Sequence, residues 1–130
     1  MSPITDRFTA IIVNYNGGQL LLDCVWSIQN AGLKPAQVIV IDNGSKDTSM
    51  TDLQQHIPGC RVVLMGCNAG FAKAVNQGLH LIDTDYAVLI NNDARLESNA
   101  FRALSAAFDA HPRGAFIGGR LLNEDGSLQN

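Results

Sequence analysis

The sequence predicts an α/β domain built around a mostly parallel sheet. Short apolar runs recur along the chain, and stretches with a helical spacing of apolar residues separate them. The runs are continuously apolar rather than alternating, which is typical of strands that are covered on both faces. Strands interleaved with helices form βαβ units, and such units build parallel sheets. The length of 130 residues fits one domain with one core.

Four apolar runs are the expected strands, and a fifth, glycine-rich run is a shorter candidate. They are residues 8–13, 36–42, 60–65, 86–90 and, as the short candidate, 114–119. Between and after these runs, apolar residues recur three or four positions apart, as on one face of a helix. The helix faces are expected to hold Leu20, Leu21, Cys24, Val25 and Ile28, then Phe71, Val75, Leu79 and Ile82, and finally Phe101, Leu104 and Phe108.

Three residues are expected to cap helices. Ser45 or Asp47 is placed to cap a helix between the second and third strands, and Ser98 is placed to cap the helix after the fourth strand. Trp26 is expected to pack within the first helix.

The composition excludes several classes of function. The net charge is −3 and the few Lys and Arg residues are scattered, so the chain lacks the basic patch that nucleic-acid binding needs. No apolar run approaches the roughly 20 residues of a membrane span. The three cysteines are odd in number and lack C-x-x-C spacing, which indicates free thiols in a cytoplasmic protein, with a disulfide or a zinc site as the alternative.

Four polar or glycine-rich loops follow the four main strands. Right-handed crossovers place the carboxyl ends of parallel strands along one edge of the sheet, and ligands of such sheets bind outside that edge. The loops are "NYNGG" (residues 14–18), "DNGSKD" (42–47), "GCNAGF" (66–71) and "NNDAR" (91–95). Their convergence on this carboxyl edge predicts a ligand-binding site there.

Asp42 and the segment 68–78 each have two interpretations. The Asp42 carboxylate either caps a turn or accepts hydrogen bonds from a base or a hydroxyl of a ligand. The small residues of 68–78 either let the backbone approach a phosphate or pack a helix on the sheet. Asn76 is polar among apolar helix residues, which favours a role in ligand binding or in holding a loop, and Lys73 meets either a phosphate or solvent.

The fourth loop opens with Asn91, Asn92 and Asp93. These residue types commonly end a strand in a turn. They also suit a hard cation, because one carboxylate together with diphosphate oxygens and water is a usual way to hold Mg²⁺ or Mn²⁺. Asp93 is then the metal ligand, and the two asparagines shape the loop or bind the nucleotide.

Other enzyme classes lack support in the sequence. There is no G-x-G-x-x-G after the first strand and no G-x-x-x-x-G-K-[ST], which argues against a dinucleotide-binding domain and a P-loop. A receiver domain needs an acidic pair after its first strand, where this chain has Asn14 and Asn16. His56, His80 and His111 have no ligand spacing, and we expect them to be surface or structural residues.

Taken together, "IIVNYNGG", "VIVIDNGSKDTS", "NAGFAKAVNQG" and "VLINNDARL" resemble glycosyltransferase family 2 in their order and spacing. The resemblance runs from about Phe8 to the last residue, and "GGRLLNEDGSLQN" is similar to a segment of rhamnosyltransferase-like members. It implies a GT-A fold, a three-layer α/β/α sandwich around a mostly parallel sheet, here truncated. Residues 1–130 are then a single nucleotide-sugar (donor) binding domain, the N-terminal part of a longer glycosyltransferase.

The resemblance also implies roles for individual residues. Nucleotide-sugar binding falls on Tyr15, Asn16, Asp42, Asn68, Gly70, Asn76, Asn92 and Asp93, and Gly78 completes the N-x-G…N-x-G element that shapes the nucleotide pocket. Asp93 matches the last acid of D-x-D and is the expected ligand of Mg²⁺ or Mn²⁺. Asn91 departs from the first acid of that motif. The general base and the acceptor site belong to the family's second half and are expected beyond Asn130.

The implied function is an inverting glycosyltransferase of polysaccharide, O-antigen or cell-wall glycan synthesis. The donor is a dTDP-, UDP- or GDP-sugar, with rhamnose as the sugar of the rhamnosyltransferase-like members, and the acceptor is a glycan or lipid-linked hydroxyl. The protein is expected in the cytoplasm, and peripheral association of the full-length protein with the inner face of the membrane is the alternative. The alternative is a catalytically inactive fragment that binds a nucleotide sugar. A nucleotidyltransferase is a third, weaker hypothesis. The Gly-rich signature of that class, with a basic residue near the first strand, is absent from this sequence.

Overall fold

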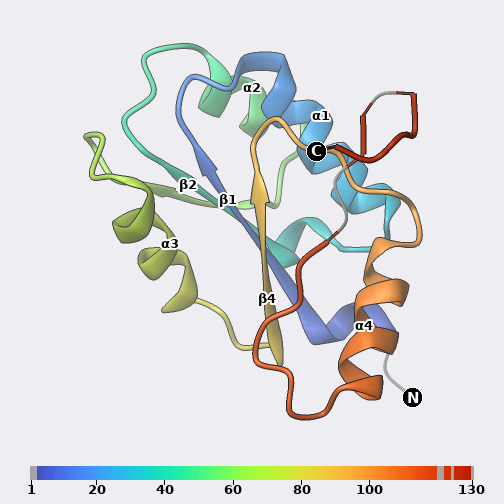
Figure 1. Ribbon diagram of the computed structural model, residues 1–130. Coiled ribbons are helices and arrows are strands. Elements are labelled where there is room, and N and C mark those ends of the chain that lie inside the picture. Colours follow the sequence, from blue (N-terminus) through green and yellow to red (C-terminus); the bar gives the residue numbers. More distant parts are fainter. Residues whose placement is uncertain (1–2, 120–121, 124, 130) are drawn as a thin grey trace.

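A single four-stranded parallel sheet forms the centre of the molecule (Figure 1). The structure is a computed structural model that describes residues 3–119, 122–123 and 125–129. The strands are β1 (Phe8–Asn14), β2 (Val38–Asp42), β3 (Arg61–Leu64) and β4 (Tyr86–Asn91). Their order is β3-β2-β1-β4, and every pairing is parallel. The predicted α/β class and the parallel sheet are therefore confirmed.

Helices cover both faces of this sheet. They are α1 (Gly18–Asn30), α2 (Ser49–His56), α3 (Phe71–Leu79) and α4 (Ala100–Ala110), with short 3-10 turns η1 (Ile4–Arg7) and η2 (Pro35–Gln37). In Figure 1, α3 lies on one side of the sheet, and α1, α2 and α4 lie on the other. The arrangement is the three-layer α/β/α sandwich that the resemblance implied.

The two central strands explain why the apolar runs are continuous. The pleat sends alternate side chains of a strand to opposite faces. Ile12 and Val40 pack in the cluster under α1, α2 and α4, whereas Ile11, Ile39 and Ile41 pack in the cluster under α3. Because both faces are covered, β1 and β2 need apolar residues at every one of these positions.

Aromatic residues fasten α4 to the amino end of the sheet. Phe101 is fully buried, and its ring centroid lies 5.3 Å from that of Phe8. The ring of Tyr86 stacks on Phe108 at 3.9 Å, and Arg7 donates hydrogen bonds to the Tyr86 hydroxyl and to Ser105. This end of the sheet is held by packing, and it lies opposite the polar loops.

Two helix faces differ from the sequence prediction. Leu20 is 52% exposed, and α1 buries Leu22 in its place. Phe71 and Leu79 are 58% and 41% exposed. The buried residues of α3 are Ala74, Val75 and Gly78 instead. The reason is close packing, because a Cβ at Gly78 would lie only 2.8 Å from Ile11 Cγ2, so the helix meets the sheet through its small residues.

Trp26 lies on α1, as predicted, and is 38% exposed. Two smaller predictions are wrong. The residue that precedes α4 is Asn99 rather than Ser98. Residues 114–119 form no strand, and Phe116 is 96% exposed. Three of the six residues in that segment are glycine, which weakens a strand, and the segment has no paired neighbour among the described residues.

No helix within the described residues is long and apolar enough to cross a membrane.

Candidate functional site

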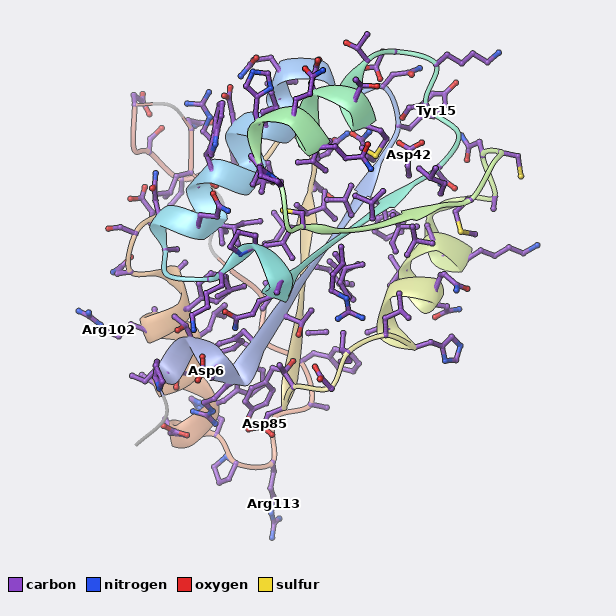
Figure 2. The ribbon with its side chains drawn as sticks, turned by 180° about the vertical axis from the view of Figure 1, so that it is seen from behind. Asp6, Tyr15, Asp42, Asp85, Arg102 and Arg113 are labelled. Atoms are coloured by element: carbon purple, nitrogen blue, oxygen red, sulfur yellow. The ribbon has the colours of Figure 1, made fainter. Side chains whose placement is uncertain are left out.

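The four polar loops begin at the same carboxyl edge of the sheet (Figure 1). The register pairs Asn14 with Asp42, Val13 with Asn91, and Asp42 with Leu64. The strand tips therefore lie side by side, as the sequence predicted. Figure 2 shows Tyr15 and Asp42 together at this end of the molecule, whereas Asp6 and Asp85 lie at the opposite end.

Asn14 stands at the centre of a polar network on this edge. Its side chain is fully buried, and its Nδ2 donates to Asp42 Oδ1 at 3.1 Å and to Ser45 Oγ at 3.2 Å. Its Oδ1 accepts from Asn92 Nδ2 at 3.0 Å. The network thus joins the tips of β1, β2 and β4. Sequence reasoning did not assign Asn14 to the site, although a polar residue at the end of a buried strand was the available signal.

Asp42 acts as a turn acceptor in this structure. It is 5% exposed and accepts hydrogen bonds from Asn14 Nδ2, from the Ser45 backbone N–H at 3.0 Å and from Ser45 Oγ at 2.6 Å. An ionised carboxylate has about four acceptor positions, so about one stays open to a ligand. The turn interpretation is confirmed, and the contact with a base stays a prediction.

The first two loops are bound to each other. Asn16 has a positive φ of 51°, and its Oδ1 accepts from the backbone N–H groups of Lys46 at 2.8 Å and Asp47 at 3.3 Å. Asp47 accepts from the backbone N–H groups of Gly18 at 3.1 Å and Ser49 at 3.0 Å. The Asn16 side chain therefore holds a loop, and Tyr15, which is 48% exposed, is the residue of this loop with a ring free for stacking.

Asp47 accepts hydrogen bonds at the starts of two helices, and its charge is stabilised. Partial burial acts to raise its pKa, but the hydrogen bonds from Ser49 and Gly18 outweigh this and lower the pKa below its ordinary value of 3.8. An ionised Asp47 thus ties the start of α1 to the start of α2. The N-cap position of α2 is Thr48, so neither Ser45 nor Asp47 occupies it. Asp47 accepts from the Ser49 N–H of the first turn, whereas Ser45 donates to Asp42.

The third loop is fastened through Asn43, which the sequence prediction also missed. Asn43 Oδ1 accepts from the Ala69 N–H at 3.1 Å, and its Nδ2 donates to the Gly70 carbonyl at 3.3 Å. Asn68 Oδ1 accepts from the Gly70 N–H at 3.1 Å. Gly70 has a φ of 90°, and a Cβ there would meet nothing within 4 Å, so its backbone faces open space at the start of α3.

The small residues of 68–78 divide between the two interpretations. Ala74 is fully buried and Gly78 contacts Ile11, so both pack the helix on the sheet. Gly70 is open to a ligand. Asn76 and Lys73 are exposed on α3, so burial does not explain the polar residue at position 76.

The fourth loop presents Asp93 at the surface. Asp93 and Asn91 are exposed, and Asn92 is half-buried through its bond to Asn14. The Ala94 N–H donates to the Asn91 carbonyl at 3.0 Å and closes a turn. Two contacts to α1 hold this loop: Leu96 N–H donates to Ser27 Oγ, and Arg95 pairs with Asp23 at 2.8 Å.

Asp93 also affects a buried thiol beneath it. Burial first, and the charge of Asp93 second, raise the pKa of Cys24 to about 12. The Cys24 Sγ–H donates to the Asn91 carbonyl at 3.4 Å. All three cysteines are free, as the sequence predicted, with Cys24 buried, Cys60 half-buried and Cys67 exposed.

The donor set fits a divalent cation only in combination with an anionic ligand. Within the described residues, no group of three His, Cys, Asp or Glu side chains could hold a metal. One exposed carboxylate, Asp93, with the hard amide oxygen of Asn91 close to it in the chain, leaves most positions of a six-coordinate ion to phosphate and water. Two of the histidines bond backbone carbonyls, because His56 and His111 each contact a carbonyl in their own helix region.

The sequence matches the model of glycosyl transferase family 2 over residues 9–130, so the chain belongs to this family. Similar structures confirm the GT-A fold. TarS of S. aureus superposes with a TM-score of 0.71 at 16% identity, covering 91% of this chain and 24% of TarS. Mannosyltransferase PcManGT of Pyrobaculum calidifontis, solved with GDP-Man and Mn²⁺, has a TM-score of 0.67 at 21% identity, covering 90% and 36% of the two chains.

Curated relatives are also glycosyltransferases or related polymerases. N-acetylglucosaminyl-diphospho-decaprenol L-rhamnosyltransferase of Mycobacterium tuberculosis is 26% identical over 136 residues, covering 96% of this chain. Teichoic acid poly(glycerol phosphate) polymerase of Staphylococcus epidermidis is 26% identical over 99 residues, covering 73% of this chain and 14% of that protein. The chain spans 44% of the length of the mycobacterial relative.

Proposed function

We propose that this chain is the nucleotide-sugar-binding part of an inverting glycosyltransferase. The observation that carries the proposal is the meeting of the four family loops at one carboxyl edge, where Asn14 links Asp42 to Asn92. Two structural neighbours support the class of donor, because TarS 1–349 was solved with UDP-GlcNAc and PcManGT with GDP-Man. Both ligands are sugars on a nucleoside diphosphate.

Different residues of the carboxyl edge bind different parts of the nucleotide-sugar donor. Tyr15, exposed beside the tips of β1 and β2, offers its ring to the base. Asp42 accepts one N–H of the base at its remaining acceptor position. Gly70, with open space on its Cβ side, lets the diphosphate approach the backbone at the start of α3.

Asp93 is the proposed ligand of Mg²⁺ or Mn²⁺. A divalent cation there would act as a Lewis acid on the leaving diphosphate. Asp93 supplies the negative charge that attracts the ion, and Asn92, held by Asn14, fixes the loop that carries it. The departure at Asn91 from an acidic residue leaves one carboxylate rather than two, so we expect metal binding to be weak without the nucleotide.

The reaction follows from this arrangement. A carboxylate removes the proton of an acceptor hydroxyl, the hydroxyl oxygen attacks the anomeric carbon, and the nucleoside diphosphate leaves with the electron pair of the broken bond. We assign that carboxylate and the acceptor site to the part of the relatives that this chain does not span. Rhamnose as the sugar and a lipid-linked acceptor are further parts of the proposal, supported by the name of the mycobacterial relative. A glycan acceptor and a cytoplasmic location at the membrane surface also belong to the proposal.

Calorimetry tests the donor site directly. The chain is titrated with UDP, dTDP and GDP, each with and without Mn²⁺. We expect at least one nucleotide to bind, and Mn²⁺ to tighten that binding by tenfold or more. Asp93→Asn should remove the effect of Mn²⁺ and leave the metal-free affinity within about twofold, because it deletes only the charge that faces the ion.

Asp85→Asn is the matched control, because Asp85 is an exposed carboxylate at the opposite end of the sheet (Figure 2). It should change neither affinity. If none of the three nucleotides binds the wild-type chain, the proposed donor site is wrong. Nucleotide binding without sugar transfer to an acceptor would favour the second candidate, an inactive fragment that binds a nucleotide sugar. The observation behind this candidate is that the chain covers 44% of the mycobacterial relative.

A further inference from the structure

Asn14 is buried as completely as the apolar residues around it, yet its side chain is polar. Both of its N–H bonds and its carbonyl oxygen have partners, namely Asp42 and Ser45 for Nδ2 and Asn92 for Oδ1. Buried amides are retained at a cost unless every polar atom is satisfied. Here the partners lie 28, 31 and 78 residues away in the chain. Asp42 and Ser45 belong to the second loop and Asn92 to the fourth, so this one side chain connects its own loop to two others.

An asparagine amide fits this position because it donates and accepts hydrogen bonds at the same time. The Asp42 carboxylate has no proton to donate when ionised, so its partner must be a donor, whereas Asn92 Nδ2 needs an acceptor. A carboxylate at position 14 would place two like charges about 3 Å apart. An aliphatic side chain would remove one of the three hydrogen bonds to Asp42 and the bond that holds Asn92.

Gly17 provides the space for the Asn14–Asn92 bond. Its backbone angles, φ −73° and ψ −21°, are open to any residue, so conformation does not require a glycine. A Cβ at this position, however, would collide with Asn14 Oδ1 and would lie 2.7 Å from Asn92 Nδ2. The glycine therefore serves the hydrogen bond that passes beside it.

We propose that Asn14 is a positioning residue that couples the two ends of the donor site, the base end at Asp42 and the diphosphate end at Asn92 and Asp93. The proposal rests on the proposed function for its ligand, but the coupling itself is a property of the unliganded chain. Through Asn14, the orientation of Asp42 and the placement of the fourth loop change together.

Four variants test the coupling. Asn14→Ala removes the link, Asn92→Ala removes its far partner, and the double variant closes a mutant cycle. Thr9→Val is the matched control, because Thr9 is also on β1, is 2% exposed and makes one part-buried side-chain hydrogen bond, to Thr84 Oγ1 at 2.7 Å, at the other end of the strand. It removes a hydrogen bond of a buried residue without touching the carboxyl edge.

The first readout is the dissociation constant of the nucleotide that binds the wild type in the presence of Mn²⁺. We expect Asn14→Ala to weaken binding at least tenfold, and the double variant to be no more than twofold weaker than Asn14→Ala. Thr9→Val should stay within twofold of the wild type. Binding of Asn14→Ala within twofold of the wild type, or independent and multiplying effects of the two alanines, would overturn the proposal.

The second readout needs no ligand. Amide hydrogen exchange is followed at Ser45, whose N–H bonds Asp42, and at Ala94, whose N–H closes the turn after β4. Asn14→Ala should speed exchange at both amides at least tenfold, and Thr9→Val at neither. If the wild type binds none of UDP, dTDP and GDP, the proposed function fails, and exchange alone decides the coupling: unchanged exchange at Ala94 contradicts it.

Asn92→Ala keeps the test decisive if Asn14→Ala does not fold. This variant removes the Asn92 Nδ2 donor to Asn14 Oδ1 and leaves the bond from Asn14 Nδ2 to Asp42 in place. We expect faster exchange at Ala94 with little change at Ser45. Equal acceleration at both amides would show general loosening of the edge and would count against a directed link.

Discussion

At the scale of single residues, most polar side chains of the carboxyl edge serve the loops before they serve a ligand. Asn16, Asn43 and Asp47 each accept backbone N–H groups of a neighbouring loop. Satisfying these groups matters because loop backbone near a covered sheet has few other partners. The residues left with exposed functional groups, above all Tyr15 and Asp93, are the ones on which the proposed donor contacts depend.

The Asp47 carboxylate predicts how the stability of the chain depends on pH. Its pKa is lowered in the folded chain, so its contribution to stability is complete above the ordinary value of 3.8 and is lost as the pH falls through the folded-state pKa. We expect Asp47→Asn to lower the free energy of unfolding at pH 7, and its difference from the wild type to shrink as the pH falls from 5 to 3. Urea unfolding at a series of pH values measures this. A difference that does not vary with pH would contradict the prediction.

At the scale of elements, Phe101 is the fully buried aromatic anchor of α4. Phe101 lies fully buried against Phe8, whereas Phe116, a few residues beyond the helix, is 96% exposed. Replacing either phenylalanine by alanine deletes the same atoms. A comparison of the two variants therefore isolates the effect of burial on stability.

We expect Phe101→Ala to reduce the free energy of unfolding by about 3–5 kcal/mol, as large-to-small changes in a packed core do. Phe116→Ala should change it by less than about 0.5 kcal/mol, because the ring already contacts solvent. Chemical denaturation of both variants supplies the comparison. Similar losses in the two variants would mean that α4 is not held by Phe101.

At the scale of the whole molecule, the cysteines report on folding. Burial raises the pKa of Cys24 to about 12 and that of Cys60 to about 11, so neither thiol forms the reactive thiolate near neutral pH. Cys67 is exposed on the third loop.

We expect one thiol of the native chain to react rapidly with a disulfide reagent at pH 8, and all three to react at once in denaturant. Cys67→Ser should abolish the rapid phase and leave the slow one. Rapid reaction of a second thiol in Cys67→Ser would show that the core around Cys24 or Cys60 opens readily.

Local sequence determined the layers and the location of the site. Apolar runs predicted four strands, and Asn or Asp ends three of them, because strand burial and turn formation depend on nearby residues. Local spacing failed for α3, where Phe71 and Leu79 are exposed, since the fit of Gly78 against Ile11 decides which face of the helix meets the sheet.

Tertiary structure alone decided the roles within the site. The importance of Asn14 and Asn43 comes from partners at least 26 residues away, which no local pattern connects. The same holds for Gly17, whose helical backbone angles give no reason for a glycine until Asn14 and Asn92 are brought beside it. The sequence by itself determined which residues end the strands, and the parallel register of the sheet decided which of them meet.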